Sequence, residues 1–208
     1  MGLIGSRGSM KPRGQEKRRR RAMMVLSVEG SNKTERQYFS GLADNQSVYT
    51  VRFAVGNDTD PEKIVTNCLA HIKSIEFDAA LGDVAYCVFD TDVDSGNQGK
   101  IDNAIRMAGN QAEVILSNPC FEFWFLCHFT YTTKPYSSNQ SLLNDLKREL
   151  PSYEKNKDMT DALKNKTRNA IKNARDVDAH HLSLVRKPNS MQCNPSTAVY
   201  RIVEHLIQ

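Results

Sequence analysis

Short apolar runs alternate with longer amphipathic stretches between residues 22 and 129, and this alternation restricts the fold more than any other feature of the chain. The apolar runs have the length and the β-branched and aromatic content of strands, whereas the amphipathic stretches repeat their apolar residues at helical spacing. Strands that alternate with helices form right-handed crossovers and a parallel sheet covered on both faces. We therefore predict an α/β fold with a parallel sheet of about four strands flanked by helices. The strand candidates are 22–28, 48–55, 83–89 and 112–117, and the helix candidates are 34–43, 60–75 and 99–109.

The last part of the chain has a helical pattern. The segment "NPCFEFWFLCHF" (118–129) is apolar nearly all round and is predicted to be a helix that begins at Asn118 and Pro119. We expect residues 22–129 to form the α/β core and residues 130–208 to form a helical extension that packs on it. The helices expected after residue 130 lie at 139–150, 158–175 and 194–208.

Composition sets the class of protein. With 208 residues, 39% of them hydrophobic, the chain can bury one substantial core. It has no apolar run of the roughly 18 to 20 residues that a membrane span needs, and no signal-peptide pattern, so we expect a cytoplasmic protein. The five cysteines have no paired spacing and lie mostly in apolar segments, which predicts reduced, buried thiols. A zinc site built from cysteines and histidines would need closer pairs.

Charge is concentrated at the start of the sequence. Residues 1–21 hold eight of the 28 Lys and Arg residues and one of the 24 acidic residues, which gives this segment a net charge of +7 and leaves −3 for the rest. We expect a disordered basic tail, whose first nine residues resemble a cloning remnant. Such a tail can hold a phosphate backbone by counterion release, or it can simply aid solubility.

Four carboxylates lie at the predicted carboxyl ends of two strands, where ligands collect in parallel α/β sheets. Glu29 ends the first apolar run, and "VFDTDVD" places Asp90 at the end of the third, with Asp92 and Asp94 beyond it. Alternate residues of an extended chain point the same way, so Asp90 and Asp92 can face one point. A carboxylate-only cluster of this kind suits Mg²⁺ or Mn²⁺ and phosphate chemistry.

Two other interpretations of the aspartate-rich segment remain open, a simple turn and a phosphatase motif, whereas an EF-hand calcium loop fails on detail. Asp favours turns, so the segment can be a turn with no further role. An EF-hand calcium loop fits poorly, because its sixth position is Ser95 instead of Gly and its twelfth is Ile101 instead of Glu. A haloacid-dehalogenase-like phosphatase also uses an aspartate pair at a strand end, but there the motif lies on the first strand and Glu29 would have no role.

Several motifs together resemble a known family. A glutamate and glycine at the end of the first strand, with DxD at the end of the third, resemble the Toprim fold of topoisomerases, primases and overcoming-lysogenization-defect nucleases. The segments "VEGSNKTERQYF", "VFDTDVD", "SNPCFEFWFLCHF" and "NPST" follow, in this order, the pattern of the RloB-like family, which includes the AbiLii abortive-infection proteins. The resemblance extends from about residue 22 to the C-terminus. It implies a role in bacterial defence against phage beside an ATPase of the AAA or ABC-like kind.

The resemblance assigns roles to particular residues. It gives Glu29 the role of general acid or base or metal ligand, and it makes Asp90 and Asp92 the metal ligands. Asp94 would be a further metal ligand. Additional candidates at the same edge are Glu35, Asn118, Glu122 and His128. For Glu35 a favourable helix-start charge, and for His128 a helix C-terminal cap, are equally simple interpretations.

A basic stretch near the C-terminal side can bind a nucleic-acid backbone or can be an ordinary solvated helix face. Its candidate residues are Lys155, Lys164, Lys166 and Arg168.

The leading functional expectation is metal-dependent cleavage of nucleic-acid phosphodiesters, on DNA or RNA, tRNA included. A binding subunit with a vestigial metal site is the alternative from another class. The chain has no GxxxxGK[ST] loop, so any control by nucleotide would come from the partner ATPase.

Overall fold

A five-stranded sheet forms the centre of the molecule. The computed structural model describes residues 20–30, 33–43, 47–92 and 95–207. The strand order is β2-β1-β3-β4-β5, with the first four strands parallel and β5 antiparallel to β4. The predicted parallel α/β sheet is therefore confirmed, and the fifth strand is an addition that the sequence did not indicate. The strands are β1 (Ala22–Val28), β2 (Tyr49–Phe53), β3 (Val84–Asp90), β4 (Glu113–Asn118) and β5 (Ser196–Thr197).

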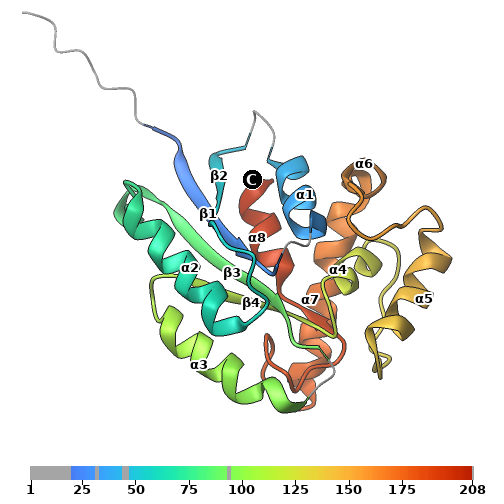
Figure 1. Cartoon of the computed structure of the whole chain (residues 1–208). Helices are drawn as coiled ribbons and strands as arrows, with labels where there is room; N and C mark the ends of the chain where they lie inside the picture. The colour runs from blue at the N-terminus through green and yellow to red at the C-terminus, as the bar shows by residue number, and fades with distance from the viewer. Residues whose placement is uncertain (1–19, 31–32, 44–46, 93–94, 208) are drawn as a thin grey trace, which may run out of the picture.

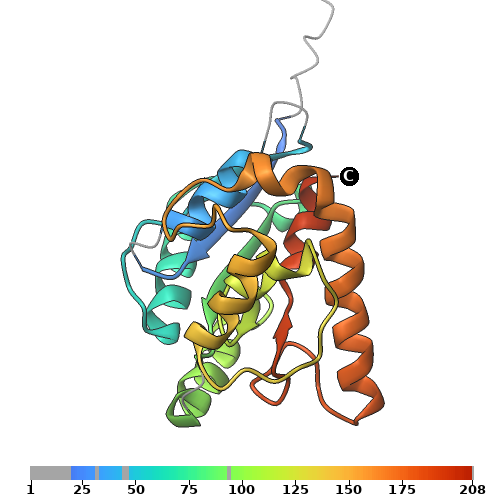
Figure 2. The ribbon, with the colours of Figure 1, turned by 90° about the vertical axis from the view of Figure 1, so that its right-hand side faces the viewer.

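Helices cover both faces of this sheet (Figure 1). On one face, α2 (Pro61–Ser74) and α3 (Gln98–Ala108) pack on β1, β3 and β4. The other face carries the larger core, in which the aromatic residues of α4 (Glu122–Cys127) lie. Figure 2 shows the long helix α7 running beside this face of the sheet. Helix α5 lies on the same side and packs against α4. The remaining helices are α1 (Lys33–Leu42), α5 (Asn139–Glu149), α6 (Thr160–Leu163), α7 (Thr167–Ser183) and α8 (Val199–Leu206).

Helix α2 shows how the local sequence determines an element. The carboxylate of Asp60 accepts hydrogen bonds from the backbone amides of Glu62 and Lys63, and Pro61 occupies the first helical position. Its buried residues form one stripe that faces the sheet: Ile64, Val65, Cys68 and Ile72. The helix predicted at 60–75 is thus confirmed.

Two expected helix starts were wrong. Asn118 does not begin a helix but ends β4, where it pairs with Ser196 of β5, and α4 starts only at Glu122. The physical reason is strand pairing, because the backbone of Asn118 continues β4 and is paired with β5. In the same way Ser196 and Thr197 form β5, and the last helix begins at Val199 instead of 194. The segment 158–175 is divided between α6 and α7, and α7 continues to Ser183.

The outer edge of β4 is protected by a side chain as well as by β5. Asn189 accepts a hydrogen bond from the amide of Leu116 through Oδ1 (2.8 Å) and donates one from Nδ2 to the carbonyl of Val114 (2.7 Å). This amide therefore pairs with β4 as a strand residue would, and it does so from a left-handed backbone with φ of 55°.

The five cysteines are buried and free, as predicted. In the described part of the chain, no helix is both long enough and apolar enough to cross a bilayer.

Candidate active site

The carboxyl ends of β1 and β3 lie side by side. Val28 of β1 pairs with Val88 of β3, so Glu29, which follows β1, and Asp90, which ends β3, reach the same edge. The amide of Asp90 donates a hydrogen bond to Oε2 of Glu29 over 3.1 Å. The sheet itself therefore brings together two of the residues that the sequence analysis selected.

Asp92 lies beyond the strand and is held differently. Its backbone is left-handed, with φ of 45°, so the extended geometry expected for the aspartate pair does not continue past Asp90. The side chain is exposed, and its Oδ1 accepts a hydrogen bond from Nδ2 of Asn139 at the start of α5 (3.0 Å). Asp94 lies outside the described residues.

Two further carboxylates approach this edge from helices. Glu35, in the first turn of α1, is only 4% exposed, and its buried Oε2 has no hydrogen-bond partner among the described residues. Glu122, the first residue of α4, is 7% exposed, and Tyr153 donates a hydrogen bond to its Oε1 over 2.6 Å. A buried charge needs a partner, so this arrangement costs free energy unless something else stabilises it.

The negative charges of these carboxylates raise one another's pKa values. Burial raises the pKa of Asp90 well above its usual value, and the charges of Glu29, Glu35, Glu122 and Asp92 raise it further. Burial also raises the pKa of Glu35 to about 8, with contributions from Glu122 and Glu29. The pKa of Glu29 is raised by burial, although the hydrogen bond from the Asp90 amide lowers it in part. Mutual repulsion of this kind is typical of a site that binds a cation.

The basic candidates separate into two places. Lys155 lies in the chain between Tyr153, which bonds Glu122, and Asn156, which bonds Thr34, and its charge partly offsets the raised pKa values of Glu29 and Glu35. Lys164 and Arg168 instead line a pocket of about 530 Å³ beside Gly41 and Leu42, at the opposite end of α1 from Glu35.

Lys166 lies over the ring of Phe129, with 4.1 Å between its Nζ and the ring centroid. The structure therefore does not make one continuous surface of the basic stretch and the carboxylates.

Asn118 and His128 have structural contacts. The side-chain Nδ2 of Asn118 donates a hydrogen bond to the carbonyl of Met191 over 3.2 Å, on the edge that carries Asp90. His128 is 1% exposed and lies among aromatic rings, and its Nδ1 is 2.9 Å from the carbonyl of Trp124. Burial lowers the pKa of His128 to about 4, so the ring is neutral near pH 7. His128 is the C-cap residue of α4, which is the alternative role that the sequence offered for it.

The residues at this edge suit a hard cation. In the described part of the chain, no three His, Cys, Asp or Glu side chains form a ready-made metal group. Magnesium does not require one, because it keeps several waters and is commonly held by one or two carboxylates together with substrate phosphate. The unpartnered Oε2 of Glu35 and the carboxylate-only set of oxygens agree with such an open site.

The chain matches a protein-family model described as RloB-like protein over residues 24–206. The chain belongs to the RloB-like family. For this RloB-like protein, no curated protein and no solved structure gave a match.

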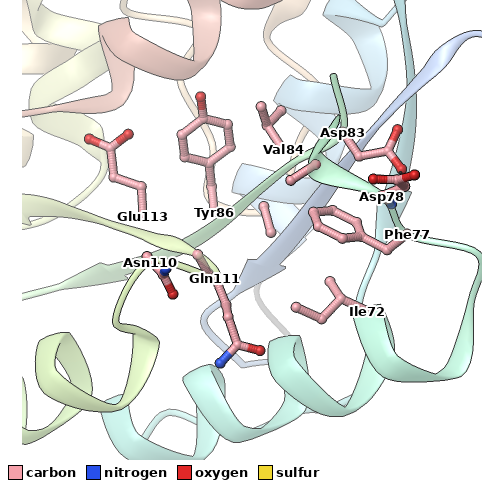
Figure 3. A pocket seen from close by; sticks show the side chains of 12 residues that line it. Ile72, Phe77, Asp78, Asp83, Val84, Tyr86, Asn110, Gln111 and Glu113 are labelled. Carbon is pink, nitrogen blue, oxygen red and sulfur yellow. Dashed lines mark hydrogen bonds between the residues drawn. The ribbon is translucent and has the colours of Figure 1, made fainter. Parts of the chain in front are cut away.

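The RloB-like protein has a concave region at the other end of the strands from these carboxylates. A pocket of about 490 Å³ lies at the amino-terminal ends of β3 and β4, where Figure 3 shows Asp78 and Asp83 on one side and Glu113 on the other. Arg20 pairs with Asp83 and Arg201 pairs with Glu113, each over 2.7 Å. Two carboxylates of the pocket are thus already neutralised, unlike those at the carboxyl edge.

Sequence reasoning missed two residues of the site, Tyr153 and Asn139. Both lie after residue 130, in polar segments with no motif, and each reaches its carboxylate only through the folding of the chain. No pattern in the sequence could have indicated these contacts.

Proposed function

We propose that this RloB-like protein is a metal-dependent nuclease of Toprim type that hydrolyses nucleic-acid phosphodiesters. One observation carries the proposal: Glu29 after β1, Glu35 in α1, Asp90 in β3 and Glu122 in α4 act on one another at one edge of the sheet. The glutamate after β1 and the DxD pair that begins at the end of β3 follow the Toprim pattern.

The chain's own residues have distinct roles in this proposal. Asp90 and Asp92 would hold Mg²⁺ or Mn²⁺, with Asp94 as a further candidate. Glu29 accepts a proton from the attacking water, because the Asp90 amide fixes its Oε2 and its raised pKa makes it a stronger base than an ordinary carboxylate. A bound ion supplies Lewis-acid polarisation of the scissile phosphate.

The biological setting follows from the family resemblance. We infer that the protein is the effector of an anti-phage, abortive-infection system, and that a partner ATPase of the AAA or ABC-like kind controls it. The absence of a GxxxxGK[ST] loop in the chain supports control by a separate subunit.

Cleavage assays test the proposal. Purified protein, alone and with the proposed partner ATPase, would be incubated with plasmid DNA, single-stranded DNA and tRNA, in Mg²⁺, Mn²⁺ or EDTA. We expect cutting that needs the metal ion and is lost in Glu29→Gln and Asp90→Asn, while circular dichroism shows both variants folded. Cutting that survives in both variants would contradict the assignment.

A second candidate function is nucleic-acid or partner binding without cleavage. The observation in its favour is that no three-ligand metal group exists among the described residues. Retention of nucleic acid without cutting, with the ATPase present and in every metal condition, would support this function and overturn the first.

A further inference from the structure

The segment 150–157, here called the covering loop, follows α5 and lies against the carboxylate edge. Figure 1 shows the chain returning from α5 toward α1 and α4 before it enters α6. Leu150 and Tyr153 are buried. The Tyr153 hydroxyl reaches Oε1 of Glu122 at 2.6 Å, and its ring packs against Phe125, with 6.0 Å between the centroids. The covering loop is therefore attached to α4 through Tyr153.

The covering loop is also attached to α1. The amide of Asn156 donates a hydrogen bond to Oγ1 of Thr34 over 3.1 Å, and Thr34 directly precedes Glu35. Asn156 has a left-handed backbone, with φ of 64°, which asparagine tolerates better than most residues. The two attachments lie on either side of Lys155, and they hold the loop to the elements that carry Glu122 and Glu35.

Lys155 differs from the lysines near it. Lys157 pairs with Glu154 over 2.8 Å, and Lys164 pairs with Asp161 over 2.6 Å. Lys155 is exposed, and no carboxylate of the described residues lies within 4.0 Å of its ammonium group. Its charge nevertheless acts on Glu29 and Glu35. The ammonium group of Lys155 therefore lies near the acidic cluster but forms no ion pair with a carboxylate of the described residues.

A phosphodiester that approaches this edge is repelled by the carboxylates, and a nearby ammonium group offsets the repulsion. We propose that Lys155 is a substrate-binding residue of the site, whose ammonium group binds a phosphate oxygen beside the carboxylates, and that Tyr153 is a positioning residue that holds the covering loop in place. This inference rests on the proposed function, because it names a contact to the substrate of that site.

Binding, measured apart from cleavage, tests the inference. Asp90→Asn protein would be titrated into fluorescein-labelled single-stranded DNA, and separately into labelled tRNA, in Mg²⁺ at several salt concentrations. When Lys155→Gln is introduced into the Asp90→Asn protein, binding of at least one probe should weaken by roughly ten-fold. The slope of log affinity against log salt concentration should fall by about the amount of one phosphate contact. The matched control, Lys157→Gln, removes a charge two positions away and should change affinity by less than about two-fold.

A double-mutant cycle tests the positioning role. Tyr153→Phe keeps the ring and removes only the hydroxyl that bonds Glu122. It should weaken probe binding in protein that has Lys155 and have little further effect in Lys155→Gln protein, because the hydroxyl acts through the lysine. A general loss of structure would weaken both equally, and that result would overturn the positioning role.

The possible results separate the two proposals. Equal affinity of Lys155→Gln and Lys157→Gln protein, or no binding of either probe, overturns the role of Lys155. Loss of binding in Lys155→Gln alone supports that role even if the native protein cuts neither probe. Failure of the nuclease proposal is read from the cleavage assays with Glu29→Gln, which do not depend on these affinities.

Discussion

The amide of Asp90 holds the carboxylate of Glu29, at 3.1 Å, across the neighbouring ends of β3 and β1. Because the parallel register fixes both residues, their relative position depends on the whole pairing of the two strands and not on a flexible loop.

The first prediction separates the two uses of the Glu29 side chain. Glu29→Gln keeps an oxygen that can accept the Asp90 amide, so its free energy of unfolding should stay within about 0.5 kcal/mol of the native value. Glu29→Ala leaves that amide without its acceptor and should cost about 1 kcal/mol more. Urea denaturation measures both, and neither variant should cleave nucleic acid. Equal stabilities would show that the hydrogen bond contributes nothing.

The second prediction concerns the effect of a divalent ion on stability. An ion that binds only the folded protein stabilises it by about 2.7 kcal/mol when its concentration is 100 times its Kd, which raises Tm by several degrees in a chain of this size. We expect Mg²⁺ to raise Tm relative to EDTA in the native protein but not in Asp90→Asn. Asp161→Asn removes an exposed carboxylate on α6, paired with Lys164, and should keep the full rise. The same rise in Asp90→Asn would place the ion elsewhere.

The third prediction concerns how the free energy of unfolding depends on pH through Asp83, which lies at the amino-terminal end of β3. The guanidinium of Arg20 and the amides of Met23 and Asp78 bond the Asp83 carboxylate and lower its pKa to about 2. A lowered pKa contributes stability above the unfolded value of 3.8, and that stability is lost as the pH falls toward 2. Asp83→Asn should therefore cost about 2 kcal/mol at pH 7 and clearly less at pH 3.

Urea unfolding between pH 7 and pH 3 checks this window, with Glu154→Gln as the control, since Glu154 and its partner Lys157 are both well exposed. A cost of Asp83→Asn that is independent of pH would exclude the charge of Asp83 as its origin.

The fourth prediction concerns the shielded edge of β4. Asn189→Asp keeps the oxygen that accepts the Leu116 amide, but it replaces the donor to the Val114 carbonyl by a second oxygen. The repulsion and the lost hydrogen bond should destabilise the protein by about 1 to 3 kcal/mol at pH 7. Thermal unfolding measures the loss, and Ser190→Ala, which leaves both contacts to β4 intact, serves as the neighbouring control. An unchanged Tm in Asn189→Asp would contradict a role for this amide in protecting the strand.

The sequence predicted the parts of the fold that local patterns determine. The apolar runs of β1 to β4 and the capped, striped helix α2 lie where they were expected, because burial and capping are readable from neighbouring residues. The strand β5 was missed because its two residues, Ser196 and Thr197, carry no strand pattern and pair only through β4. Asn118 was misplaced because the same proline pattern is typical of a helix start.

The sequence named the carboxylates of the candidate site, Glu29 and Asp90 at strand ends and also Glu35 and Glu122, but not the side chains that contact them. Glu29 and Asp90 could be selected because the ends of parallel strands share one edge. The contact of Tyr153 with Glu122 joins residues 31 positions apart, and Asn139 reaches Asp92 from 47 positions away. Such contacts depend on packing between distant elements, which spacing alone does not encode.

The order of these segments along the chain has a consequence for synthesis on the ribosome. Glu29, Asp90 and Glu122 are made first, whereas the covering loop and β5, the strand that closes the outer edge of β4, are made later. Domains made from the N-terminus begin to fold while synthesis continues. A partly synthesised chain therefore carries these acidic groups without Tyr153, Lys155 or the closed edge of β4, and the described arrangement exists only once the chain has been made through β5.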